Sequence, residues 1–407
     1  MTDVAVTRGA VRQDERALAP DLARGVMLLL IVMSNTAFHL WGARHGASGW
    51  HPVDGSWLDR ATQFLMIVTL DLRAYPLFAF LLAYGMVQLF ERQLAAVAQP
   101  STVDKRRAVA LLRRRSLWLI VFGFAHAALF LAGDILGHYG FATLFLGWLL
   151  IRRGNRTLYI ALGIATLLWL LPMVDVVRAF VTGDLGGSGP FTEPTVDLYA
   201  AGETDWVTAA LRRLQTWAWV AGVGTFAWIA MPQLVIAFLA ARHRVLENPG
   251  DHLRLLRWTA VLGIAIGWAG GLPLALAHVG AIDVPSDAVA ESGVLPVLAE
   301  VTGIPCGLGY VAVFGLLAHR MSARKRHPAI AALGRRSLTG YLAHSVLFAP
   351  VLAAWGLGLG EHLGSAGMAL FAVGVWLVTV VAAAAADRRG LPGPAEWLLR
   401  RLVYGRR

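Results

Sequence analysis

The stretch LARGVMLLLIVMSNTAFHLW, residues 22–41, contains Arg24 as its single charged side chain and decides the fold class. A bilayer core about 30 Å thick is crossed by about twenty apolar residues in a helix, and this stretch is long enough to do so. Apolar residues make up 57% of the 407-residue chain and charged residues only 15%. A soluble domain typically has about 25% charged residues, so the composition indicates a membrane protein.

Further runs of similar length and composition follow along the chain. Because each run suits a membrane-spanning helix, the sequence predicts an all-α, polytopic integral membrane protein with about ten transmembrane helices. The runs are 22–41, 72–90, 116–132, 135–151, 158–181, 217–240, 258–280, 294–317, 338–358 and 366–386.

Basic residues lie almost entirely in alternate loops, and their distribution predicts the orientation. With the N-terminus inside, the cytoplasmic segments contain 30 of the 36 Lys and Arg residues, whereas the long loop 182–206 on the other side is acidic. The positive-inside rule therefore predicts that both termini are cytoplasmic. The net charge of +11 is explained by these loops, so we expect no nucleic-acid partner.

The chain is expected to divide into three parts. Residues 1–21 form a cytoplasmic tail, residues 22–216 form an N-terminal transmembrane half that carries the site, and residues 217–404 form a C-terminal transmembrane domain. The loop 182–206 is either a plain connector or a lid over the site. The end of the chain, 394–404, mixes leucines with arginines and is expected to lie along the inner membrane surface.

Ionisable and amide side chains inside predicted spans are the candidate functional residues, because lipid disfavours them unless they face the bundle interior. Asp21, Arg24, Asn35 and His39 follow one another at helical spacing on one face of the first span. Asp21 and Arg24 suit either an ion pair at the interface or a functional role at the cytoplasmic end. Asn35 is the stronger functional candidate, since His39, His45 and His51 come soon after it.

Two more clusters lie in the following spans. Asp71 opens the second span beside Arg73, whose side chain points to a nearly opposite face and is expected to reach the lipid headgroups. Pro76 predicts a discontinuous helix there. His126 lies in the third span, with Asp134 two turns further on, and the two suit either a proton-transfer pair or a structural hydrogen bond.

The segment GRRSLTGY, residues 334–341, begins the ninth span at its cytoplasmic end. Arg336 and Ser337 suit a phosphate site, or alternatively a positive anchor with a helix cap. The spacings of histidine and cysteine ligands that bind metals are absent from the sequence, so no metal and no permanently bound cofactor are expected.

Several segments resemble the YeiB-like family of bacterial inner-membrane proteins, whose C-terminal half is a domain of unknown function. They are PDLARGVMLLLIVMSN (20–35), DLRAYPLFAFLLAYGM (71–86), GFAHAALFLAGDILGHYG (123–140), GRRSLTGYLAHSVL (334–347) and PGPAEWLLRRLVYG (392–405). The family's fold is similar to the transmembrane acyltransferase group that includes heparan-α-glucosaminide N-acetyltransferase. That resemblance implies an oxyanion-binding role for Asn35 and a catalytic role for His45, one position short of the enzyme's spacing.

The resemblance implies a transmembrane acyltransferase of the bacterial inner membrane with acyl-coenzyme A (acyl-CoA) as co-substrate. The acyl group would pass to an envelope glycan, lipid or small molecule at the outer face, with Asp71 or Asp134 orienting the histidine. His45, His39 and His51 remain alternatives for the base. A carrier with a path of His126, Asp134 and Asp71, and a non-catalytic envelope-assembly protein, are the rival functions. Membrane lipid is a partner in each case, and a homodimer is one candidate assembly.

Overall fold

The computed structural model describes residues 17–405, apart from residues 96, 98, 187–194, 226–230 and 324–327. Most of the predicted tail 1–21 and part of the loop 182–206 lie outside the described residues. The described part of the chain is helical, and its single β-type contact is an isolated bridge between His45 and Pro52. The sequence-based prediction of an all-α membrane protein is confirmed.

The helices before residue 220 are α1 (Leu18–Ser34), the 3-10 turn η2 (Asn35–His39), α2 (Trp57–Thr69), α3 (Ala74–Leu94), α4 (Thr102–Leu129), α5 (Ile135–Leu149), α6 (Asn155–Leu170), α7 (Met173–Thr182), α8 (Thr195–Leu198) and α9 (Trp206–Trp217). A π-helical turn, η3 (Ala218–Val223), continues α9. The remaining elements are α11 (Pro232–Arg242), η4 (Pro249–His252), α12 (Leu253–His278), α13 (Ser286–Val289), α14 (Val294–Ala323), α15 (Ala329–Arg335), α16 (Ser337–Leu352), η5 (Leu359–Glu361), α17 (Ser365–Arg388) and α18 (Pro394–Tyr404).

Helices occupy all of the predicted apolar runs within the described residues. Among the described residues, six helical segments are long and apolar enough to cross a membrane, and α5, α11 and α16 are apolar but shorter. The count of ten crossings therefore stays a prediction. The outward surface is itself apolar: on α6, Ile164 and Leu167 are 57% and 65% exposed. Such a surface is stable in lipid and not in water.

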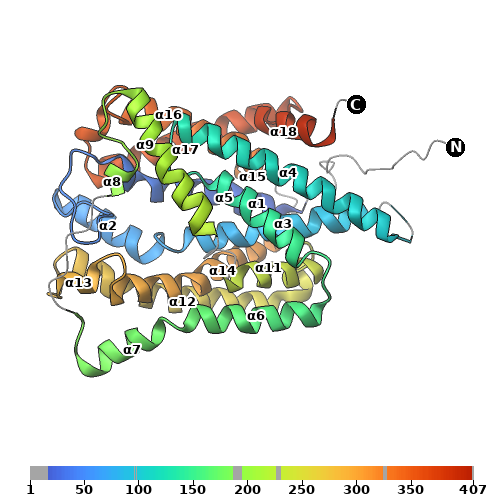
Figure 1. Ribbon diagram of the computed structural model, residues 1–407, viewed down its shortest axis with the longest axis horizontal. Coiled ribbons are helices and arrows are strands. Elements are labelled where there is room, and N and C mark those ends of the chain that lie inside the picture. The colour runs from blue at the N-terminus through green and yellow to red at the C-terminus, as the bar shows by residue number, and fades with distance from the viewer. Residues whose placement is uncertain are drawn as a thin grey trace.

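The helices lie side by side, and their ends gather at two ends of the molecule. Most long helices run along the horizontal axis of Figure 1, with α8 and α13 at the left end and α18 and the beginning of α4 towards the right end. The segments predicted to be cytoplasmic and those predicted to be external therefore lie at opposite ends. Which end faces the cytoplasm is still given by the distribution of basic residues.

Helix α1 lies inside the bundle and contacts α3, α14, α15, α16 and α17. Two glycines allow α15 to approach it closely. A Cβ atom on Gly25 would lie 2.2 Å from the carbonyl oxygen of Ile330, and one on Gly334 would lie 1.7 Å from that of Asp21. Larger side chains would force these helices apart. The contact brings Arg24 of α1 beside the start of α16.

A break between α2 and α3 positions Asp71. Leu72 has a positive φ of 59°, and Pro76 lies in the first turn of α3. The backbone there is crowded, because a Cβ on Gly303 would lie 2.1 Å from the carbonyl oxygen of Leu72. The predicted discontinuity is present. The expectation that Arg73 reaches the headgroups is wrong, because its side chain is fully buried and donates to the Gly267 carbonyl oxygen at 2.9 Å.

Candidate functional site

A serine, a histidine and an aspartate form a buried chain between α16, α4 and α5. Ser345 Oγ lies 2.7 Å from His126 Nε2, and His126 Nδ1 lies 2.9 Å from Asp134 Oδ1. The His126–Asp134 contact is a close approach of the imidazole to the carboxylate, without the alignment of a hydrogen bond. Both side chains are fully buried, which agrees with the expectation that they face the bundle interior.

Asp134 is held in place by its position as the N-cap of α5. Its Oδ2 accepts hydrogen bonds from the Gly137 backbone N–H at 2.6 Å and from Trp217 Nε1 at 3.3 Å. The Gly137 N–H is one of the N–H groups at the start of a helix that have no carbonyl partner within the helix. A negative charge such as the Asp134 carboxylate is stabilised at this position. Oδ1 is therefore free of these two bonds and lies beside His126 Nδ1, where the negative charge of the carboxylate acts on the imidazole.

A cavity of about 20 Å³ adjoins Ser345 and brings the end of the first span to the same place. Asn35, His39, Tyr341 and His344 are the other polar residues in its lining, which is otherwise apolar. The volume is enough for about one water molecule. Of the predicted site residues, the structure thus brings together Asn35, His39, His126 and Asp134, and it adds Ser345.

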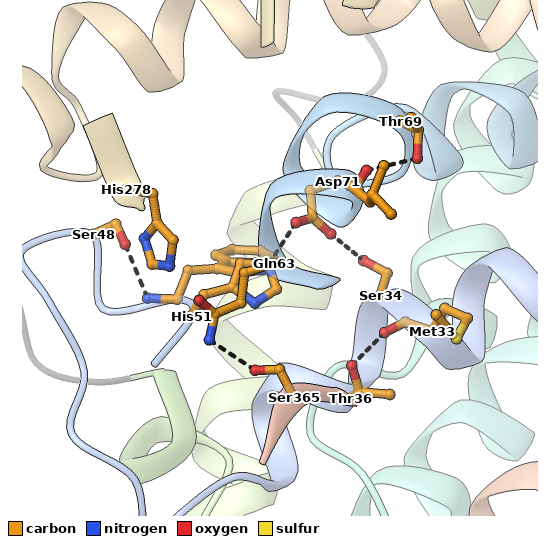
Figure 2. Close-up of polar contacts among 12 residues, drawn as sticks. Met33, Ser34, Thr36, Ser48, His51, Gln63, Thr69, Asp71, His278 and Ser365 are labelled. Atoms are coloured by element: carbon orange, nitrogen blue, oxygen red, sulfur yellow. Dashed lines mark hydrogen bonds and ion pairs between the residues drawn. The ribbon is translucent and has the colours of Figure 1, made fainter. Parts of the chain in front are cut away.

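A second histidine–aspartate pair lies at the break between α2 and α3 (Figure 2). His51 Nε2 is 2.6 Å from Asp71 Oδ2, and Ser34 Oγ donates to Asp71 Oδ1 at 3.4 Å. The His51 ring also lies 5.8 Å from the ring of His278. Asp71 was expected to orient a catalytic histidine, and the histidine that it contacts is His51.

The His51–Asp71 pair anchors the loop that joins α1 to α2. His278 Nε2 lies 3.1 Å from the Pro52 carbonyl oxygen and holds the same loop against α12. His45, on this loop, is 7% exposed and does not line the small cavity. Its Nδ1 lies 3.0 Å from the Ala43 carbonyl oxygen. Because a carbonyl oxygen only accepts hydrogen bonds, Nδ1 carries the hydrogen in the neutral ring and Nε2 carries the lone pair. Burial lowers the pKa of His45 below its ordinary value, and the hydrogen bond to Ala43 opposes this shift.

A larger cavity of about 310 Å³ has an apolar interior and a basic rim. Its interior is formed by leucines of α3, α4 and α16 together with Phe78, Tyr139 and Tyr341. Its charged lining consists of Arg24, Arg92, Arg115, Arg335, Arg400 and Glu396. Arg24 also contacts Asp21, and Arg335 also contacts Asp387, but the guanidinium groups still outnumber these carboxylates and Glu396, so the rim is positive. Tyr341 lines both this cavity and the small one beside Ser345.

The residues predicted to bind phosphate take different positions. Arg24 and Ser337 line the large cavity, whereas Arg336 is absent from its lining. The guanidinium of Arg336 instead donates to Asp387 Oδ1 at 3.0 Å and to the Leu391 carbonyl oxygen, so it ties α16 to α17 and the segment after it. The rim arginines 92, 115 and 400 were missed, because they lie on three different helices, α3, α4 and α18, that only the fold brings together.

The C-terminal helix α18 closes one side of the large cavity. Leu399 and Val403 pack into the core, and Arg400 lines the cavity. Glu396 accepts hydrogen bonds from the Leu338 N–H at 2.7 Å and from the Thr339 hydroxyl, so it caps the start of α16. No three His, Cys, Asp or Glu side chains in the described residues are placed to bind a metal ion.

Comparisons with known proteins agree with the resemblance seen in the sequence. Residues 240–406 match a family described as a protein of unknown function (DUF418). The chain is 27% identical over 408 residues to the uncharacterized protein YeiB of Escherichia coli (strain K12), with 96% of each chain covered. It is 24% identical over 428 residues to the uncharacterized protein YxaH of Bacillus subtilis (strain 168), and this similarity covers 96% of this chain and 95% of YxaH. No solved structure matches it significantly. The chain is thus similar over nearly its whole length to the uncharacterized proteins YeiB and YxaH, and its residues 240–406 match the DUF418 family.

Proposed function

We propose that this protein is a transmembrane acyltransferase that moves an acyl group from cytoplasmic acyl-CoA to an acceptor at the outer face of the membrane. The observation that carries the proposal is the position of Tyr341. Its side chain lines the large cavity with the basic rim and also the small cavity with Asn35, His39 and Ser345. A binding cavity for a charged amphiphile and a cluster with acid–base chemistry therefore share one wall.

The large cavity suits acyl-CoA through its charge and its apolar interior. Arginine pairs with phosphate through two parallel hydrogen bonds, and five arginines line the rim. Arg115 makes no ion pair with any residue in the described part of the chain, which leaves its charge available to a phosphate. The leucines and aromatic rings further in would contact the pantetheine arm and the acyl group.

The chemistry requires a donor for the developing oxyanion and a base for the acceptor. Asn35 supplies a carboxamide N–H at the small cavity, where it would stabilise the negative oxygen. His39 lines the same cavity, and His126, beside Asp134, contacts Ser345 in its wall, so both are candidate bases. His45 and His51 lie on the loop between α1 and α2, and Asp71 at the α2–α3 break contacts His51. An acceptor glycan, lipid or small molecule would arrive at this loop.

The proposed setting is the cytoplasmic membrane, with both termini in the cytoplasm. The rim arginines come from segments 1–24, 91–115, 318–336 and 387–407, which the positive-inside rule assigns to the cytoplasm. The donor would thus meet the rim on the side where acyl-CoA is made. No bound metal or permanent cofactor is part of this reaction.

The first test is binding of acyl-CoA to the purified protein in detergent. We expect acetyl-CoA to raise the unfolding temperature, and Arg115→Gln to weaken binding about tenfold, equivalent to about 1.4 kcal/mol. Arg178→Gln is the matched control, because Arg178 is exposed, pairs with Asp175 and lies outside both cavities. Absence of any shift with the wild-type protein, or an equal effect of both substitutions, would contradict the proposed donor.

A carrier function is the second candidate, and one observation favours it. Two separate histidine–aspartate pairs, His126–Asp134 and His51–Asp71, are buried at different positions in the bundle. Paired ionisable groups inside membrane proteins often form proton or solute paths. A carrier would neither bind nor cleave acyl-CoA, and it would couple solute uptake in proteoliposomes to a proton gradient. The same binding test therefore separates the two functions.

A further inference from the structure

We infer that Ser345 is the nucleophile that carries the acyl group covalently between the donor and the acceptor. The inference rests on the proposed acyltransferase function and adds a residue to it. Neither the sequence patterns nor the family resemblance points to Ser345. The geometry around His126 does, because it contains the three members of a serine–histidine–aspartate triad in the required order.

The order of atoms fixes the direction in which a proton can move. In a neutral imidazole one ring nitrogen donates and the other accepts. The Asp134 carboxylate lies 2.9 Å from His126 Nδ1 and favours the N–H on that nitrogen. His126 Nε2 then carries the lone pair, and it lies 2.7 Å from Ser345 Oγ, within reach of the hydroxyl proton.

Three different elements hold the triad, and all three side chains are buried. Ser345 is 8% exposed, His126 is 2% exposed and Asp134 is 1% exposed, so the triad excludes bulk water. Exclusion of water strengthens the electrostatic interactions and limits hydrolysis of an acyl ester. The adjoining cavity brings the Asn35 carboxamide, an oxyanion donor, to the face where Ser345 is exposed.

Ser345 also follows Tyr341 by one helical turn on α16. Residues four apart lie on the same helix face, so the wall shared by the two cavities leads directly to the Ser345 hydroxyl. The small cavity holds about one water molecule as it stands. A movement of the Tyr341 ring would join it to the large cavity and admit the thioester carbonyl.

Neighbouring polar residues on α16 lack this arrangement. His344 Nε2 lies 3.3 Å from the Thr379 hydroxyl of α17, and no carboxylate among the described residues contacts it. Outside α16, Ser116 on α4 is also buried, but its hydroxyl is hydrogen-bonded to the Leu112 carbonyl oxygen and to the Thr143 hydroxyl. Ser116 is therefore a structural serine and a suitable control.

The reaction has two balanced steps. In the first, Ser345 Oγ bonds to the thioester carbonyl carbon and its proton passes to His126 Nε2. The carbon–sulfur bond then breaks, and the leaving thiolate takes that proton to become coenzyme A. In the second, an acceptor hydroxyl gives its proton to His126 Nε2 and attacks the acyl-serine carbonyl. The ester bond to Ser345 breaks, and its oxygen regains the proton.

The experiment uses the full chain in lipid nanodiscs with two probes. Acid-quenched mass spectrometry after incubation with acetyl-CoA detects an acetyl group on a peptide containing Ser345. A fluorophosphonate carrying an alkyl chain reacts with activated serines and needs no acyl donor. We expect both labels on the wild type and on Ser116→Ala, and neither on Ser345→Ala. We also expect His126→Ala to lower the labelling rate about 10³-fold or more.

The outcomes separate the inference from the function on which it rests. If Ser345→Ala still releases coenzyme A at the wild-type rate, or if neither probe labels wild-type Ser345, the serine nucleophile is wrong. Release of coenzyme A by the wild type would in that case leave the acyltransferase function standing. If the fluorophosphonate labels Ser345 but acetyl-CoA is neither bound nor cleaved, the nucleophile is supported and the acyl-CoA donor is wrong.

Discussion

Ser34 and Asn35 are adjacent at the end of α1, yet they face two different histidine–aspartate pairs. Ser34 Oγ donates to Asp71, the partner of His51, whereas Asn35 lines the small cavity beside Ser345. The change from α-helix to 3-10 turn at this point alters the direction of successive side chains. One short segment thus connects the outer loop with the buried triad.

Replacing Asn35 by alanine should lower acyl transfer without unfolding the protein. If its carboxamide binds the oxyanion, the loss should be about 10²- to 10³-fold in kcat, with little change in KM, because the contact strengthens in the transition state. Ser34→Ala is the adjacent control and should retain at least most of the activity. Equal kcat values for wild type and Asn35→Ala would remove Asn35 from the mechanism.

The His51–Asp71 pair should contribute to stability. Asp71→Asn removes the carboxylate from a buried contact of 2.6 Å and should lower the free energy of unfolding by about 2 kcal/mol. The measurement is thermal unfolding in detergent of Asp71→Asn, His51→Ala and the double variant. Since the two residues touch, the effects of the single substitutions should not add. Strict additivity would show that the contact contributes nothing.

The sequence was sufficient for the fold class because each span has to satisfy the bilayer by itself. Helices lie where the apolar runs predicted them, and the break at Asp71 follows from Pro76 and its polar neighbours. The interior position of His126 and Asp134 could also be predicted, since lipid disfavours both. These inferences depend on residues that are close together in the chain.

The composition of the site could not be predicted in the same way. Ser345 lies more than two hundred residues after His126, and a single serine in an apolar helix gives no sequence signal. Arg336 illustrates the opposite error: the motif suggested phosphate, but Asp387, distant in sequence, already binds its guanidinium. Pairing between distant helices depends on packing, which local patterns do not specify.

His45 should make stability depend on pH in a specific direction. Its pKa in the folded protein is lowered from 6.5 by burial, so below about pH 6.5 the unfolded chain binds a proton that the folded protein does not. This residue's contribution to stability is complete above pH 6.5 and is lost as the pH falls towards the folded pKa. His45→Gln should therefore reduce the decrease in unfolding temperature between pH 7 and pH 5.5. An identical pH profile in both proteins would contradict this assignment.

Reporter fusions should establish the orientation. We expect fusions within residues 95–110, 320–330 and 400–407 to report the cytoplasm, and fusions within 185–205 to report the opposite side, because basic loops are retained inside. A phosphatase active only outside and a fluorescent protein active only inside provide paired readouts. A cytoplasmic position for 185–205 would invalidate the ten-span topology and the side assigned to the donor.

The activity proposed for this protein is transfer of an acyl group from acyl-CoA across the membrane. The most direct measurement uses inside-out membrane vesicles from cells that overproduce the chain, because these expose the cytoplasmic face and contain the cell's own envelope acceptors. Radiolabelled acetyl-CoA is added outside, and both coenzyme A thiol and label in lipid and glycan fractions are measured. We predict release of thiol together with transfer of label into one fraction, both strongly reduced by Asn35→Ala and unchanged by Arg178→Gln. Vesicles with and without the protein that release thiol and incorporate label equally would contradict the acyltransferase account.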